Sequence, residues 1–122
     1  MISAPHGFAV GLGLAMVLES DLIVAAPGTK FQVTETTRGL AASRHWALLA
    51  YRGLRSFATE VTITGRFFTA EEARAAGVVD RVAAPDQHLA EAYEMARAVA
   101  ANPPLSVRAT VRSRRWSASL MP

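Results

Sequence analysis

The chain has 122 residues, of which 51% are hydrophobic and 19% charged, and it contains no cysteine. This composition is typical of at most one folded domain, and it excludes a disordered chain, a disulfide framework and a thiolate metal site. The longest apolar run, Gly7 to Leu18, is too short to cross a bilayer, and Met1 to His6 lacks the basic residues of a secretory leader. We therefore expect a cytoplasmic protein with no membrane partner.

The net charge of +3 comes almost wholly from arginine, since Lys30 is the only lysine. Guanidinium groups suit phosphate oxygens, either of a polynucleotide or of a small nucleotide-bearing ligand. Arg108, Arg112 and Arg115 would share one helix face, which is either a solvated basic face or a contact for ligand phosphates. Because the sequence has no recognised nucleic-acid-binding module and no interleaved aromatic residues, we expect no nucleic acid partner.

The first part of the chain alternates between strand and helix signals. Apolar density and turn residues predict an extended segment over 1–6, a glycine turn over 7–13, a buried helix over 14–20, and strands over 22–26 and 31–33. Pro27-Gly28 marks the turn between the two strands. This order predicts an α/β arrangement.

From residue 34 onward the signals are mainly helical. We expect helices over 43–51, 56–64 and 86–101, a short helix before Gly77, a strand over 78–82, and a last helix that begins at Pro104. Thr69 and Glu72 form a capping box at the start of the short helix. The helix over 86–101 places Leu89, Ala92, Tyr93, Ala96, Val99 and Ala100 on one face.

Two segments can carry chemistry. The glycines of residues 7–13 allow a ligand to approach the backbone, and the first N–H groups of the following helix lack intrahelical partners, which favours an anionic oxygen there. A structural turn explains the same glycines equally well. Glu35 follows a short strand among apolar and hydroxyl residues, so it is a candidate general acid or base, with a surface glutamate as the alternative.

Together these segments point to a family. The order of Gly7 to Gly13, Asp21 to Ala25, Glu35, Thr64 to Ala73 and Gly77 to Val82 closely resembles the crotonase family of enoyl-CoA hydratases and isomerases. The resemblance implies the C-terminal part of a spiral of ββα turns followed by a helical region, with a partial spiral core over 1–68 and a mainly helical region over 69–122. It also implies a homo-oligomer, a trimer or hexamer, in the full-length form.

The resemblance further implies an acyl-CoA substrate of fatty acid metabolism, with coenzyme A as part of the substrate, no separate cofactor and no metal. Members of the family share an oxyanion hole of backbone N–H groups, and the resemblance implies that one of these is the N–H of Leu12. Glu35 falls on a proton-transferring glutamate. We expect Gly11, Gly13, Phe31 and Trp46 to contact substrate, and we interpret His6 as a structural side chain. His45 is interpreted as a packed or exposed side chain, with a general base as the alternative.

One family position differs. Hydratases use two glutamates, and the first of them falls on Ala15, which cannot transfer a proton. A single carboxylate suffices to move a proton between carbons, so we favour isomerase-like enolate chemistry over hydration. The second oxyanion donor belongs to an upstream segment that this chain lacks, so the alternative is a truncated or diverged, non-catalytic family member that acts only through assembly or packing.

Overall fold

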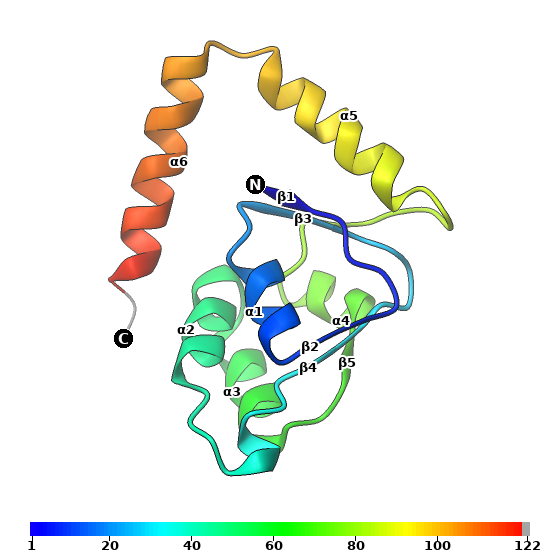
Figure 1. The fold of residues 1–122 in the computed structure, drawn as a ribbon, viewed down its shortest axis with the longest axis vertical. Coiled ribbons are helices and arrows are strands. Elements are labelled where there is room, and N and C mark those ends of the chain that lie inside the picture. The colour runs from blue at the N-terminus through cyan, green and yellow to red at the C-terminus, as the bar shows by residue number, and fades with distance from the viewer. Residues whose placement is uncertain (121–122) are drawn as a thin grey trace.

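The computed structural model describes residues 1–120 as short strands, a 3-10 turn and helices (Figure 1). The strands are β1 (Ile2–Ser3), β2 (Phe8–Val10), β3 (Leu22–Ala25), β4 (Lys30–Gln32), β5 (Phe68–Thr69) and β6 (Arg81–Val82). The helices are α1 (Leu12–Leu18), α2 (Ser43–Arg52), α3 (Arg55–Thr64), α4 (Ala70–Ala75), α5 (His88–Ala100) and α6 (Pro104–Ser119), and the 3-10 turn is η1 (Thr36–Arg38).

The strands form two small sheets. In the first, β3 lies between β1 and β6 and is parallel to both, and in the second, β4 pairs with β2 in parallel and with β5 in antiparallel orientation. Within residues 1–120, β1 and β2 each have one neighbouring strand, so each is an edge strand. Strand β5 spans the predicted boundary at residue 68, and β6 lies after it, yet both pair with earlier strands. The two regions therefore share their sheets, and a boundary at residue 68 stays a prediction.

The hydrophobic core lies between the sheets and helices α1 to α4. Its largest fully buried side chains come from α1, both sheets, α2, α3 and the segment after α4: Leu14, Leu18, Ile23, Val24, Phe31, Val33, Leu49, Val61, Phe68, Val78 and Val79. Phe68 packs on Phe31 and on Phe57, with ring centroids 5.4 Å apart in both pairs. This core fixes β4 against α3 and so positions the segment that carries Glu35.

Most of the predicted elements are present, with shifted bounds. The predicted glycine turn over 7–13 is partly strand, because residues 8–10 pair with β4, and the chain bends on either side of this strand, at Gly7 and Gly11. Helix α1 therefore begins at Leu12, two residues before the predicted start. The predicted strand over 78–82 is reduced to β6, because the N–H groups of Val78 and Val79 donate to the Ala73 carbonyl in α4 and not to a neighbouring strand.

The helical predictions for the middle of the chain are confirmed. Helix α3 ends at Gly65 and α4 is followed by Gly77, both with positive φ. The capping box is complete, because the Thr69 side chain accepts from the Glu72 N–H and the Glu72 side chain accepts from the Thr69 N–H. The last segment is helix α6 with Pro104 at its start, as predicted.

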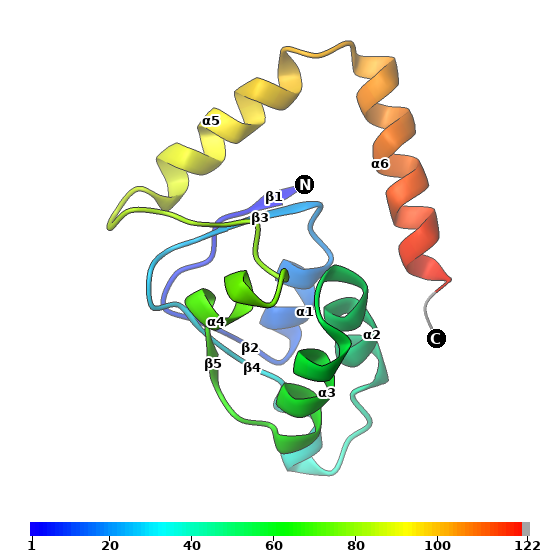
Figure 2. The ribbon, with the colours of Figure 1, turned by 180° about the vertical axis from the view of Figure 1, so that it is seen from behind.

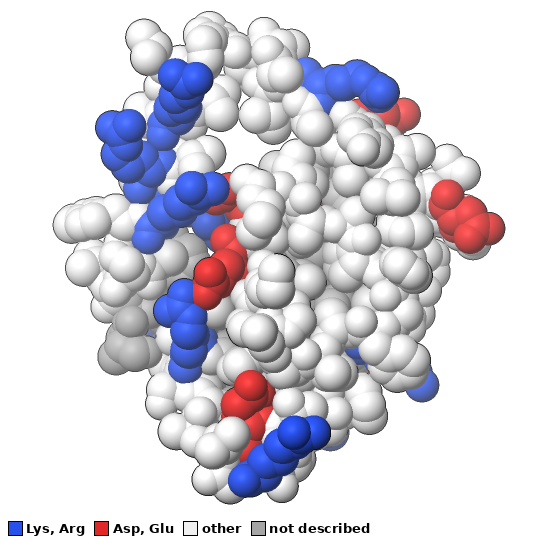
Figure 3. Space-filling view, viewed as in Figure 1, with Lys and Arg blue, Asp and Glu red and all other residues white. Residues whose placement is uncertain are grey.

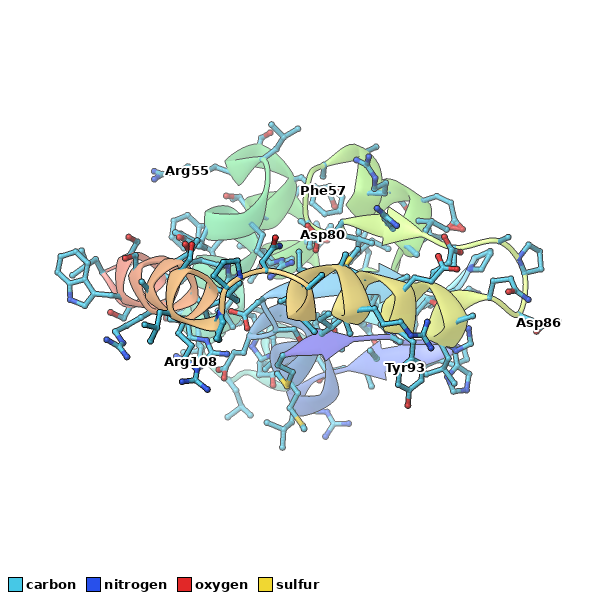
Figure 4. The ribbon with its side chains drawn as sticks, turned by 90° about the horizontal axis from the view of Figure 1, so that it is seen from above. Arg55, Phe57, Asp80, Asp86, Tyr93 and Arg108 are labelled. Carbon is cyan, nitrogen blue, oxygen red and sulfur yellow. The ribbon has the colours of Figure 1, made fainter. Side chains whose placement is uncertain are left out.

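Helices α5 and α6 form an arch over the body (Figures 1 and 2). No residue of either helix is fully buried. The predicted apolar face of α5 is only partly buried, with Leu89 57% and Tyr93 63% exposed. Figure 4, seen from above, shows Tyr93 on α5 and Arg108 on α6 projecting outward from the arch.

Helix α6 is attached to the body mainly through Asp21, which follows α1. The Asp21 carboxylate accepts hydrogen bonds from Arg114 at 3.0 Å, from Arg115 at 2.8 Å and from the Met1 ammonium at 2.6 Å. Burial alone would raise the pKa of Asp21, but the hydrogen bonds from Arg115 and the ammonium outweigh it and lower the pKa to about 2. The arginines of α6 thus anchor a helix as well as forming a basic face.

Candidate active site

The candidate site is built around the bend at Gly11, between β2 and α1. Gly11 has φ 54° and ψ −123°, a conformation open almost only to glycine. A Cβ atom on this residue would lie 2.8 Å from Thr34 Oγ1. The Gly11 N–H donates to the Gln32 carbonyl at 3.1 Å, which holds the bend against β4. The strand register therefore brings the start of α1 beside the segment after β4.

Glu35 faces this bend. Its Oε2 atom would lie 3.8 Å from a Cβ on Gly11, and its side chain is 23% exposed, so the carboxylate is neither in open solvent nor sealed in the core. The backbone holds Glu35 firmly, because its carbonyl accepts from the N–H groups of Arg38 at 3.0 Å and Leu40 at 2.9 Å. The structure thus brings together a carboxylate and the glycine bend, 24 positions apart in the sequence.

The backbone N–H of Leu12 starts α1. No side chain caps this helix, and within residues 1–120 the Leu12 N–H has no hydrogen-bond acceptor. The Leu12 side chain is 75% exposed, and Phe8, Met16 and Leu40 are also more than half exposed. The start of α1 therefore presents an uncommitted backbone donor with the exposed Leu12 side chain beside it.

His45 completes the group. It lies in the first turn of α2 and is 7% exposed, and its Nε2 atom is 2.9 Å from the Gly11 carbonyl oxygen and 3.7 Å from Glu35 Oε1. The sequence did not predict this contact of His45 with Gly11, because a single histidine in an apolar helix is most often a packing residue. Its only sequence signal is a polar ring within the apolar run of the predicted helix over 43–51.

The other predicted site residues lie at different places. Gly13 is exposed in the first turn of α1, beside Leu12. Phe31 is 1% exposed and packs on Phe68 in the core. The Trp46 side chain reaches toward α3, where its Nε1 donates to Thr59 Oγ1 at 2.9 Å. Phe31 and Trp46 are therefore not part of the group around Glu35, and their contact with substrate stays a prediction.

Ala15 lies one turn into α1 and is buried, 6% exposed. It accordingly offers no second proton-transferring group beside Glu35. Thr34 is the nearest additional polar side chain, and its hydroxyl lies 3.5 Å from Glu35 Oε1. Glu35 is thus the one carboxylate that the described residues bring to the bend.

A separate hollow of about 440 Å³ lies between α2 and α6, away from Glu35. Arg44, Arg114 and Arg115 line it, and basic side chains gather over α6 with acidic ones beside them on the body (Figure 3). Arg44 is paired with Glu19, and Arg114 and Arg115 are paired with Asp21. Arg52, which also lines the hollow, is paired with Asp80. The carboxylate that lines this hollow, Glu19, is paired with Arg44, so we place the candidate chemistry at Gly11 and Glu35.

Within residues 1–120, no three His, Asp or Glu side chains come together in an arrangement that could hold a metal ion. In the same part of the chain, no helix has both the length and the apolar character that a membrane span requires.

Residues 1–120 match the family described as enoyl-CoA hydratase/isomerase. Over 112 residues the chain is 37% identical to the mevalonyl-coenzyme A hydratase sidH of Aspergillus fumigatus, a match that covers 91% of this chain and 42% of the relative. It is 34% identical over 110 residues to the carnitinyl-CoA dehydratase of Salmonella arizonae, covering 89% of this chain and 42% of that protein.

A solved structure of an enoyl-CoA hydratase from Mycobacterium tuberculosis superposes on the chain with a TM-score of 0.89 at 37% identity. That superposition covers 99% of this chain and 48% of the solved chain. The chain thus spans less than half the length of these three relatives.

Proposed function

Because the chain belongs to the enoyl-CoA hydratase/isomerase family, we propose that it acts on acyl-CoA thioesters through a stabilised enolate. Glu35 is the proton-transferring group, and the Leu12 N–H is one donor of the oxyanion hole. The observation that carries this proposal is the approach of the Glu35 carboxylate to the Gly11 bend. Gly11 and Gly13 allow a thioester carbonyl to approach the backbone closely.

The reaction needs both groups at once. The Glu35 carboxylate removes a proton from the carbon next to the thioester carbonyl, and the electron pair moves onto the carbonyl oxygen. The Leu12 N–H donates to this oxygen as its negative charge develops, and one such donor contributes about 3 kcal/mol in other enzymes. Returning the proton to C4 of a 3-enoyl thioester, rather than to C2, yields the 2-enoyl isomer.

We propose isomerisation or another enolate reaction ahead of hydration. Hydration requires one group to activate water and a second to exchange a proton with carbon, and Ala15 occupies the position that the resemblance gives to the other glutamate. The exposed apolar side chains Phe8, Leu12 and Met16 beside the bend suit an acyl chain. The substrate class agrees with the acyl-CoA names of the relatives.

We further propose that the chain corresponds to the C-terminal half of a family member. It spans 42% of the relatives' length, and the edge strands β1 and β2 can each accept another strand from a preceding ββα unit. The second oxyanion donor would come from that unit. Assembly into a trimer or hexamer, a role in fatty acid metabolism and a cytoplasmic location belong to the same proposal.

The test uses the complete protein with 3-enoyl-CoA and 2-enoyl-CoA, following the conjugated thioester by its absorbance. Glu35→Gln should lower isomerisation by at least about a hundredfold, because it removes the only carboxylate at the bend. The matched control Glu94→Gln changes an exposed glutamate on α5 and should leave the rate unchanged. Faster hydration than isomerisation would refute the preference, and no turnover of either thioester would favour the non-catalytic alternative.

A further inference from the structure

We infer that His45 is a positioning residue that orients the Leu12 N–H by holding the carbonyl of Gly11. This inference rests on the proposed function, in which the Leu12 N–H is an oxyanion donor. His45 comes from α2, 34 positions along the chain from Gly11, and its ring is buried against the bend. A buried polar ring in contact with a backbone carbonyl must be satisfied there, so the contact fixes both partners.

The peptide bond between Gly11 and Leu12 couples the His45 contact to the direction of the Leu12 N–H. The Gly11 carbonyl and the Leu12 N–H belong to one planar peptide unit, and in a trans peptide they point in opposite directions. All peptide bonds of residues 1–120 are trans. Whatever holds the Gly11 oxygen therefore sets the direction in which the Leu12 N–H points, which is away from His45.

The Gly11 oxygen has two donors. Ala15 N–H donates at 3.1 Å, which is the first hydrogen bond of α1, and His45 Nε2 lies at 2.9 Å from the opposite element. A carbonyl oxygen only accepts, so Nε2 carries a proton and donates it to Gly11. Helix α1 alone would leave this terminal peptide unit free to tilt, and the His45 contact removes that freedom.

His45 Nε2 is hydrogen-bonded to Gly11 and not to the Glu35 carboxylate. Glu35 Oε1 lies 3.7 Å from His45 Nε2, beyond hydrogen-bonding distance, so the Nε2 proton is committed to Gly11. The neighbouring Thr34 provides only a hydroxyl, which lies 3.5 Å from Glu35 Oε1. His45 thus sets the geometry of the bend beside Glu35 and leaves the carboxylate available for a substrate proton.

The kinetic test compares three variants of the full protein. His45→Leu removes the donor, His45→Gln keeps an N–H at similar reach, and His6→Leu removes an exposed histidine as the matched control. We expect His45→Leu to lower kcat by about 10- to 100-fold with KM changed by less than about threefold, because a misdirected donor fails mainly in the transition state. His45→Gln should restore most of kcat, and equal rates for the Gln and Leu variants overturn the inference.

A second measurement needs no turnover. In ¹⁵N-labelled protein, the His45 ring should carry its proton on Nε2, and residual dipolar couplings should report a changed Leu12 N–H direction in His45→Leu but not in His45→Gln. A wild-type ring protonated only on Nδ1, or an unchanged Leu12 coupling in a folded His45→Leu, overturns the inference. An inactive wild-type protein that passes this test refutes the proposed function instead, so the two failures are distinguishable.

Discussion

Replacing Gly11 with alanine tests whether the bend is as sterically constrained as the structure indicates. At φ 54° and ψ −123°, a residue with a Cβ costs about 1–3 kcal/mol in backbone strain. The new Cβ would also lie 2.8 Å from Thr34 Oγ1, a contact that forces one of the two atoms to move. Alanine restricts the unfolded chain and so returns up to about 1 kcal/mol.

The expected net loss for Gly11→Ala is about 2 kcal/mol of unfolding free energy, which corresponds to a decrease in Tm of roughly 6–12 °C for a chain of this size. Urea unfolding and thermal melts measure both quantities. Gly7→Ala is the matched control, because Gly7 also has positive φ, 69°, but its Cβ would meet no atom within 4 Å. Gly7→Ala should therefore show the backbone cost without the clash.

The clash itself is tested in a Thr34→Ala background, where the hydroxyl that the new Cβ meets is gone. Gly11→Ala should then cost less than in the wild type, by the part of the loss that Thr34 causes. The steric reasoning is refuted if Gly11→Ala is as stable as the wild type, or if its cost is the same with and without the Thr34 hydroxyl.

Two further predictions concern the ion pairs. The folded pKa of Asp21, about 2, lies below its ordinary value of 3.8, so its ion pairs stabilise the fold above pH 3.8 and are lost as pH falls toward 2. Asp21→Asn should lower the free energy of unfolding by about 1–2 kcal/mol near neutral pH, a range that allows for the exposure of Arg115. Urea titrations at decreasing pH should show this loss vanishing near pH 2. A loss that is independent of pH would contradict the ion-pair role of Asp21. The buried Arg52 side chain donates to Asp80 and to the carbonyls of Val78 and Ser20. Arg52→Met should therefore lower the free energy of unfolding in urea by about 3–5 kcal/mol, whereas Arg55→Met, at an exposed position, should change it by almost nothing. A loss below about 1 kcal/mol for Arg52→Met would show that water satisfies the groups left without Arg52.

The family resemblance and the mixed α/β fold, both predicted from the motifs, are confirmed by the family match and by the solved structures. Local signals succeeded where a short stretch contains all the interacting groups. The capping box of Thr69 and Glu72 spans three residues, and Gly65 and Gly77 end helices through their own φ angles. Such features need no distant partner, so their residues alone determine them.

Distant contacts were decided only by the tertiary structure. The spacing on α5 predicted an apolar face, but nothing in it indicated that Leu89 and Tyr93 would remain exposed on an arch. The sequence placed Glu35 after a strand, yet its approach to Gly11 depends on the pairing of β2 with β4. His45 could not be assigned to the bend from its neighbours, because its partner is 34 positions away. Periodicity specifies which faces are apolar, whereas strand register and helix packing determine which side chains meet.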